Sequence, residues 1–246
     1  MLNQRESGTE NSWRTKLFQG TLQFPKDILD FIFPRICIVS GEKIPEDNSN
    51  PFVSDSILTS LNRISSSDEA ELFSKLEADE CLSLFTFSGE CEMSKIIHTM
   101  KYSGFKSIGN VLGRILGEEL AKKLQGEINF ILPVPIHKAR MKERGYNQSY
   151  HIAKGVAGIV SGVLANDLVI RNRNTQTQTK LNKKERSENV SLAFEINSKN
   201  SLRVENSVVL VVDDVITTGA TINEITKVLR DSGVKNVIAA SVAMAS

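Results

Sequence analysis

The chain has few cysteines, almost no net charge and no long apolar run. Its 246 residues contain 3 cysteines, and 30 basic side chains stand against 29 acidic ones, which leaves a net charge of +1. No apolar run is long enough to span a bilayer, and the first residues hold no signal-peptide core. Scattered cysteines without a secretory segment are typical of a reduced cytoplasmic protein. We therefore expect a cytoplasmic chain with no membrane span.

The cysteines also fall short of a zinc-finger pattern. Cys37 is followed at the usual spacing by Ser40 instead of a second cysteine, and Cys81 and Cys91 lie far along the chain. Four tetrahedral ligands cannot be assembled at zinc-finger spacing from these residues. A site that joins two of the cysteines to His98 and a carboxylate is the remaining alternative. We predict that the protein holds no zinc.

The rest of the composition suits a globular α/β protein. With 40% hydrophobic residues, a chain of this length can bury a substantial core. From residue 130 to 243 the pattern reads strand, helix, strand, loop, strand, helix and strand, with the second strand at 168–170. This alternation predicts a parallel sheet with right-handed crossovers. Upstream, apolar stripes at 93–100 and 108–120 predict two helices, and no internal repeat is visible.

The segment 208–221 carries the clearest functional signal. Residues 208–212 are all Val or Leu, which predicts a parallel strand buried on both faces. Asp213 and Asp214 follow directly, at the carboxyl end where open α/β sheets place their ligands. Apolar residues at 222, 225 and 229 then predict a helix that begins near Ala220.

The turn between this strand and helix is suited to a phosphate group. A helix N-terminus offers unpaired N–H groups and the positive end of the helix dipole, while hydroxyls and a glycine allow close contact with an anion. The predicted phosphate cradle consists of Thr217, Thr218, Gly219, Ala220 and Thr221. The two carboxylates can accept hydrogen bonds from sugar hydroxyls, and a divalent cation lets them tolerate a nearby phosphate. A ribose 5-phosphate satisfies both halves; the alternative is that Asp213 and Asp214 only cap the turn.

Positive charge is concentrated in two connections of the chain. Residues 137–147 carry a local balance of +3, and residues 171–186 a balance of +5. Both connections leave the carboxyl ends of predicted strands, so positive charge is concentrated beside the proposed sugar phosphate. The alternatives are ordinary solvated surface or a nucleic-acid patch. A plain nucleic-acid binder leaves Asp213 and Asp214 unexplained, because carboxylates repel a phosphate backbone.

These segments resemble known families. Residues 208–221 are similar to the phosphoribosyl pyrophosphate (PRPP) motif of type I phosphoribosyltransferases. Residues 130–149 and 173–194 resemble the ComF family of competence-associated, phosphoribosyltransferase-like proteins, and with 98–104 the resemblance covers about residues 84–246. It implies the Rossmann-like type I phosphoribosyltransferase fold of the α/β class, a parallel sheet flanked by helices with an N-terminal helical hood.

The resemblance also implies a role for each motif. Asp213 and Asp214 would hold the ribose hydroxyls and the Thr217–Thr221 turn the 5-phosphate, with Mg²⁺ bound nearby through PRPP. The turn after Pro135 corresponds to the pyrophosphate loop, with His137, Lys138, Arg140, Arg144 and Asn147. The segment 172–194 corresponds to a mobile catalytic loop that contributes Arg173, Lys180 and Arg186. His98 and Lys101 are candidates to face the site, although a helix histidine is more often only a partly buried side chain.

The implied reaction is the Mg²⁺-dependent displacement of pyrophosphate from PRPP by a nitrogen nucleophile such as a nucleobase. The alternative is a protein that binds PRPP or a nucleotide without turnover and serves DNA uptake through a competence protein or single-stranded DNA. A homodimer is a further possibility. ComF proteins commonly begin with a zinc module of Cys-x-x-Cys pairs, from which this chain departs. We therefore divide it into a variable region at 1–83, with a degenerate remnant of that module and loops, and a phosphoribosyltransferase-type domain at 84–246.

Overall fold

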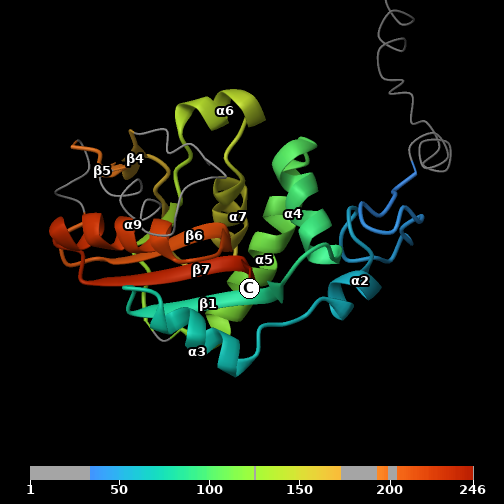
Figure 1. Cartoon of the computed structure of the whole chain (residues 1–246), viewed down its shortest axis with the longest axis horizontal. Helices are drawn as coiled ribbons and strands as arrows, with labels where there is room; N and C mark the ends of the chain where they lie inside the picture. The colour runs from blue at the N-terminus through green and yellow to red at the C-terminus, as the bar shows by residue number, and fades with distance from the viewer. Residues whose placement is uncertain (1–33, 125, 173–192, 199–203, 246) are drawn as a thin grey trace, which may run out of the picture.

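The computed structural model describes residues 34–124, 126–172, 193–198 and 204–245 (Figure 1). The helices are α2 (Asp55–Ser60), α3 (Ser66–Ser74), α4 (Glu92–Tyr102), α5 (Lys106–Lys123), α6 (Lys138–Arg144), α7 (Gln148–Val156) and α9 (Ala220–Asp231). The strands are β1 (Glu80–Phe87), β2 (Phe130–Pro133), β3 (Val163–Leu164), β4 (Val169–Arg171), β5 (Phe194–Ile196), β6 (Val208–Ile216) and β7 (Asn236–Ala245).

Five parallel strands form the central sheet, in the order β1-β7-β6-β2-β3. Along β6, Leu210 and Val212 enter the core on one face of the sheet, and Val209 and Val211 enter the core on the other. Alternate side chains of a strand point to opposite faces, so a strand covered on both sides must be apolar throughout. The prediction of a doubly buried strand at 208–212 is confirmed.

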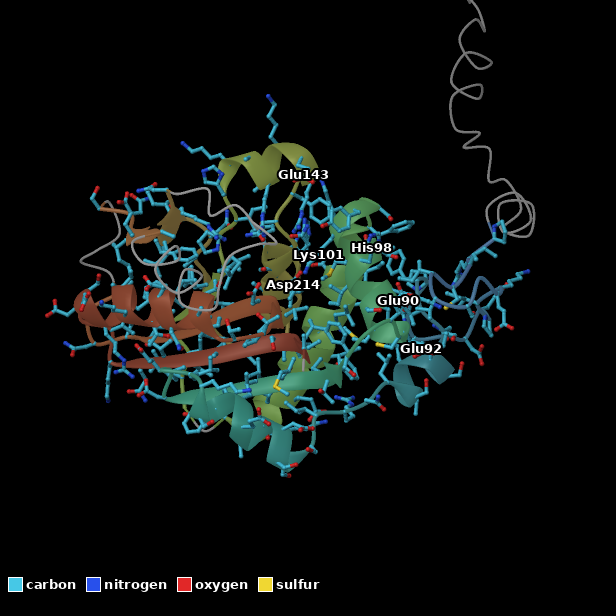
Figure 2. The ribbon with its side chains drawn as sticks, in the orientation of Figure 1. Glu90, Glu92, His98, Lys101, Glu143 and Asp214 are labelled. Carbon is cyan, nitrogen blue, oxygen red and sulfur yellow. The ribbon has the colours of Figure 1, made fainter. Side chains whose placement is uncertain are left out.

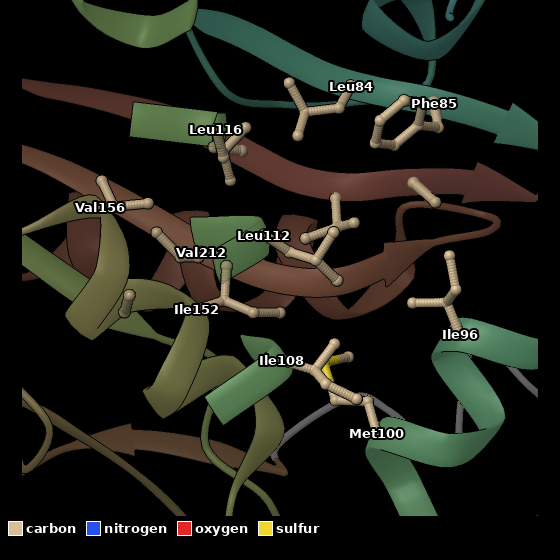
Figure 3. Close-up of a cluster of buried hydrophobic side chains, with 14 of the residues drawn as sticks. Leu84, Phe85, Ile96, Met100, Ile108, Leu112, Leu116, Ile152, Val156 and Val212 are labelled. Atoms are coloured by element: carbon tan, nitrogen blue, oxygen red, sulfur yellow. The ribbon is translucent and has the colours of Figure 1, made fainter. Parts of the chain in front are cut away.

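Helices cover both faces of this sheet. The core on one side combines α4, α5 and α7 with β6, as Figure 3 shows for Leu112, Ile152 and Val212. The core on the other side contains side chains of α3, α9 and the β4–β5 pair. The apolar stripes predicted at 93–100 and 108–120 form α4 and α5.

The chain leaves β2 and β6 toward opposite faces of the sheet. From β2 it runs through α6 and α7 to β3, whereas from β6 it runs through α9 to β7. Since α7 and α9 belong to different cores, β2 and β6 are neighbours at a topological switch point. Open α/β sheets bind their ligands in the crevice beyond the strand ends at such a point.

Prolines separate β2 from β6 just before the acidic pair. The ladder between these strands ends at Pro133, opposite Val212, and one further bond runs from the Val134 N–H to the Val212 carbonyl at 2.9 Å. Pro135 has no N–H with which to continue the ladder. Strand β6 continues to Ile216 beside β7, so the two aspartates stand beyond the end of β2.

The predicted strand at 168–170 does not join the parallel sheet. Strand β4 pairs antiparallel with β5 in a separate two-stranded sheet, and β3 takes the place beside β2. The chain turns after β3, where the Leu168 N–H donates to the Ala165 carbonyl at 3.4 Å. Leu168 then packs in the core beside α9 instead of extending the sheet, so this part of the prediction was wrong.

Residues before α3 share the core on the α4 and α5 side. Cys37, Ile44 and Val53 are buried there, and a single bridge pairs Ile36 with Lys43. The division predicted between residues 83 and 84 falls within β1, which pairs with β7 from Glu80 onward, and it stays a prediction. Among the described helices, none is both long enough and apolar enough to cross a membrane.

Helices α5 and α7 cross at two glycines. A Cβ added to Gly155 would lie 2.3 Å from the Asn110 carbonyl oxygen, and one added to Gly113 would lie 2.1 Å from the Ile152 carbonyl oxygen. Backbone cannot yield to such contacts as a flexible side chain can. The first two turns of α7 are therefore fixed against α5, and with them the residues that α7 presents to the site.

We predict that Gly155→Ala destabilises the protein by about 1 to 3 kcal/mol, the usual cost of overpacking a core. Lys154→Ala, at an exposed position on the same helix, is the matched control and should change stability by less than about 0.5 kcal/mol. Urea unfolding of both variants measures the difference. Equal stability of Gly155→Ala and the control would show that the two helices can move apart without cost.

Candidate functional site

The two aspartates at the end of β6 have different partners. Asp213 Oδ1 accepts hydrogen bonds from Ser149 Oγ and from the Asp214 backbone N–H, both at 2.9 Å. Asp214 Oδ2 lies 3.1 Å from Lys101 Nζ on α4, while its Oδ1 accepts from the Val215 N–H at 2.8 Å. Figure 2 shows Lys101 and Asp214 beside each other between α4 and the sheet.

Crowding of the two carboxylates changes the acidity of Asp213. Burial, followed by the neighbouring Asp214 carboxylate, raises the pKa of Asp213 from 3.8 to about 7. The Ser149 hydroxyl, the Asp214 N–H and the charge of Lys101 oppose this rise. Any further hydrogen-bond donor, such as a sugar hydroxyl, would therefore stabilise the two crowded carboxylates.

The predicted phosphate cradle forms one hollow with Asp213. The hollow has a volume of about 40 Å³ and is lined by Asp213, Val215, Ile216, Thr217, Thr218, Gly219, Ala220, Thr221 and Ile222. Thr217 and Thr218 are exposed, and α9 begins at Ala220. The structure thus brings all five predicted cradle residues together with one of the two predicted ribose-binding aspartates.

Gly219 shapes this cradle. Its φ of 78° lies in the left-handed region, which side chains with a Cβ rarely adopt. A Cβ at this position would also lie 2.6 Å from Leu76 Cδ2. The turn between β6 and α9, which lines the hollow, therefore depends on glycine.

The turn after β2 holds the predicted pyrophosphate-loop residues on and around α6. His137 caps α6, because its Nδ1 accepts the Ala139 N–H at 3.1 Å. Asn147 caps α7 with its Oδ1 and donates from Nδ2 to the Val134 carbonyl at 2.9 Å. These two side chains therefore shape the turn, whereas Lys138 and Lys142 are exposed at its surface and Arg140 is half-buried.

Arg144 connects this turn to α4. Its guanidinium lies 5.2 Å from the centre of the Tyr102 ring, and its Nη1 donates to Gln148 Oε1 at 3.2 Å. Gln148 is 2% exposed, and its side-chain nitrogen has no hydrogen-bond partner among the described residues. The ring of His98 also contacts Tyr102, with centroids 4.8 Å apart. Lys101 thus reaches the aspartates, while the ring contact of His98 is with Tyr102.

The role of Ser149 was not predicted. It stands at the end of the 130–149 segment, and no pattern in the sequence pairs it with Asp213, which lies 64 positions further on. Tyr146, whose hydroxyl donates to the Met100 carbonyl, was likewise recognised only as part of a motif. A hydroxyl in the first turn of α7, the second helix after β2, was the available signal, because that helix end faces the carboxyl end of the sheet.

The predicted catalytic loop lies mostly outside the described residues, and Arg173, Lys180 and Arg186 are among those not described. Arg171, at its start, is described: its guanidinium lies 5.1 Å from the ring centre of Phe194, across the β4–β5 pair. Burial, and then the charge of Arg140, lower the pKa of Arg171, while Asp213 opposes them. One positive charge of the 171–186 cluster therefore lies near the acidic pair.

A hollow beside Cys37 lies away from the acidic pair. Its volume is about 390 Å³, and Ser40, Asn48 and Asp55 are among its lining residues. Burial raises the pKa of Cys37, but hydrogen bonds from the Ser40, Ser54 and Val39 backbone outweigh it and lower the value to about 7. Within the described residues, no three His, Cys, Asp or Glu side chains gather to hold a metal. The absence of zinc stays a prediction.

Comparisons with known proteins agree with this geometry. Residues 146–245 match the phosphoribosyl transferase domain family. Competence protein F of Haemophilus influenzae is 40% identical over 44% of this chain and 46% of its own length. DNA utilization protein YhgH of Shigella flexneri is 32% identical over 59% of this chain and 64% of its own length. These similarities support a phosphoribosyltransferase-like protein of the ComF family.

Both relatives are matched over less than two thirds of their length. The structure of a hypoxanthine phosphoribosyltransferase from Staphylococcus aureus is 15% identical to this chain, with a TM-score of 0.36, and the match covers 56% of this chain and 64% of that chain. The domain match and the five-stranded parallel sheet flanked by helices together confirm the type I phosphoribosyltransferase-like α/β fold.

The raised pKa of Asp213 predicts a pH-dependent effect of Asp213→Asn. The carboxyl binds its proton more tightly in the folded chain than in the unfolded chain, so its contribution to stability is complete below about pH 4 and is lost as the pH rises through about 7. Asparagine cannot ionise. Without ligand, Asp213→Asn should therefore melt at a higher temperature than the wild type at pH 8, and the difference should vanish near pH 4.

Thermal melts between pH 4 and pH 8 measure this effect. Asp231→Asn, an exposed aspartate at the end of α9, is the control and should show no such pH-dependent gain. An Asp213→Asn protein that is less stable than the wild type at pH 8 would contradict the prediction.

Proposed function

We propose that this protein binds PRPP at the end of β6 and transfers its phosphoribosyl group to a nitrogen nucleophile such as a nucleobase. One observation carries the proposal. The acidic pair and the threonine cradle meet at the switch point of a phosphoribosyltransferase-like sheet, beside a basic turn. Each part of PRPP has a chemically matched group within this arrangement.

Different residues would bind different parts of PRPP. Asp213 and Asp214 would accept hydrogen bonds from the ribose hydroxyls, and the N-terminus of α9 would take the 5-phosphate. The charged side chains of the α6 turn, Lys138, Arg140 and Arg144, would face the pyrophosphate. In the reaction the bond from C1 to the pyrophosphate oxygen breaks, and a bond from C1 to the acceptor nitrogen forms. Binding and orientation of the reactants would supply much of the catalysis, with no nucleophilic side chain required.

Magnesium is expected to enter with the ligand. Asp213 and Asp214 present carboxylate oxygens, the donors that Mg²⁺ prefers, but the described residues offer no cage of three ligands. This donor set suits a cation that is held by the pyrophosphate oxygens and keeps several waters. When bound, Mg²⁺ would neutralise charge on the departing pyrophosphate.

The experiment that tests the proposal measures binding and turnover separately. Calorimetry with PRPP should show binding in the presence of Mg²⁺ and its loss with a chelator. Pyrophosphate release is then followed with a panel of purine and pyrimidine bases. Release with one base would establish transfer, while tight PRPP binding without release would favour a binding protein. Failure to bind PRPP with Mg²⁺ would refute the proposal.

We predict that the double variant Asp213→Asn with Asp214→Asn loses at least about 99% of its PRPP affinity. Hydrogen bonds to a charged group contribute about 1.5 to 3 kcal/mol each, and two such carboxylates would be neutralised. Calorimetry in the presence of Mg²⁺ gives the affinities, with Asp231→Asn as a control that should bind as the wild type does. Unchanged PRPP affinity in a folded double variant would remove the aspartates from the site.

A second candidate function is the binding of single-stranded DNA during DNA uptake. The matched relatives bear the names competence protein F and DNA utilization protein YhgH. On this chain, Tyr102 is 57% exposed and contacts Arg144 at the end of basic helix α6. Exposed aromatic rings next to basic side chains are typical of single-strand binding surfaces, where bases stack on the rings.

We predict for this candidate that Lys138→Ala with Lys142→Ala weakens binding of an oligothymidine strand. Each lost phosphate contact should flatten the dependence of log affinity on log salt by about 0.7. The control pair Lys227→Ala with Lys235→Ala removes the same charge from exposed positions near α9 and should leave the slope unchanged. Equal slopes for both pairs would show that α6 does not contact the DNA.

A further inference from the structure

The last turn of α4 contacts both halves of the proposed PRPP site. Its residues Met100, Lys101 and Tyr102 have partners on the turn after β2 or on β6. Lys101 makes the contact with β6, as its Nζ lies 3.1 Å from Asp214 Oδ2. A helix that precedes the matched domain thus reaches the ribose-binding pair.

This ion pair differs from the others in the described part of the chain. The side chains of Lys101 and Asp214 are 24% and 11% exposed, whereas each of the other pairs has at least one partner exposed by 42% or more. Exposed pairs contribute little, but removal of one partner from a buried pair leaves an uncompensated charge. The negative charge of Asp214 therefore needs the positive charge of Lys101 to compensate it.

The flanking contacts hold Lys101 in place. The Tyr146 hydroxyl donates to the carbonyl of Met100, and the Arg144 guanidinium packs against the ring of Tyr102. Arg144 is the last residue of α6, and Tyr146 lies between α6 and α7. The backbone on either side of Lys101 is therefore held to the turn that would bind pyrophosphate, and the lysine side chain extends from this fixed position.

The hydrogen bonds of Asp214 leave acceptor capacity for a ligand. A carboxylate offers about four lone-pair sites, of which the Val215 N–H uses one on Oδ1 and Lys101 uses one on Oδ2. Without Lys101, that oxygen would lose the positive charge that opposes the repulsion from Asp213. The Asp214 carboxylate would then rotate toward another hydrogen-bond donor.

We propose that Lys101 is a positioning residue that holds the Asp214 carboxylate in the orientation in which it accepts hydrogen bonds from sugar hydroxyls. This inference rests on the proposed function and assigns to α4 a share in the recognition of ribose. Lys101 does not contact the reacting atoms; it acts through Asp214. The contribution of the sugar hydroxyls to affinity should therefore depend on this lysine, while the contribution of the phosphate should not.

The test compares two ligands by calorimetry in the presence of Mg²⁺. Ribose 5-phosphate carries the hydroxyls, and butyl phosphate carries the phosphate alone. In the wild type, ribose 5-phosphate should bind about tenfold or more tightly than butyl phosphate, as hydrogen bonds to charged groups predict. Lys101→Met should reduce this ratio to about threefold or less and leave butyl phosphate affinity within about twofold. Lys101→Arg should restore most of the ratio.

Lys95→Met is the matched control, since Lys95 is exposed on the same helix. It should retain the wild-type ratio. Thermal melts identify unfolding, and Lys101→Gln provides a second, more polar variant if Lys101→Met does not fold. A wild-type ratio in a folded Lys101→Met or Lys101→Gln protein would overturn the role of Lys101 alone. Equal binding of both ligands by the wild type would overturn the proposed function and this inference with it.

Discussion

Two adjacent carboxylates at the end of β6 impose the main constraint on this structure. Burial and mutual repulsion both disfavour their charge, and the raised pKa of Asp213 records the cost. Each carboxylate is therefore supplied with donors from a different part of the chain: Ser149 on α7 for Asp213 and Lys101 on α4 for Asp214. Stability alone would not select such an arrangement, which is typical of a site that must bind a polar ligand.

The position of Ser149, which donates to Asp213, depends on how α7 packs in the core. The glycine crossing of α5 and α7 fixes the position of α7, while Asn147 joins the beginning of that helix to the end of β2 through the Val134 carbonyl. Ser149 is thereby brought to Asp213. The prolines at the end of β2 leave the β2-facing edge of β6 without a backbone ladder beyond Val212, while β7 continues along the other edge.

The sequence could predict those parts of the site that lie close together along the chain. Strand β6, the two aspartates and the threonine cradle are consecutive, and the period of the apolar residues was enough to place them. Lys101 was recognised as a candidate, but its pairing with Asp214 depends on the packing of α4, which no local pattern specifies. For the same reason Ser149 was missed.

Strand β4 shows another limit of prediction from sequence. Residues 168–170 are apolar enough to indicate a strand but carry no information about its partner, and β4 pairs antiparallel with β5. Asn147, a residue of the predicted pyrophosphate loop, uses its side chain for capping and for a backbone contact. Its predicted role at the pyrophosphate stays a prediction.

The predicted phosphate cradle also depends on contacts with a segment that lies far before the matched domain in the sequence. Asn223, in the first turn of α9, donates to the Lys75 carbonyl and accepts the Glu77 N–H, both at 2.9 Å, and Leu76 packs beneath Gly219. Residues 75–77 therefore act as a floor for the start of α9. A fragment trimmed to residues 84–246 would retain every proposed ligand-binding side chain and yet lose this floor. The minimal unit for binding studies should accordingly begin before α3.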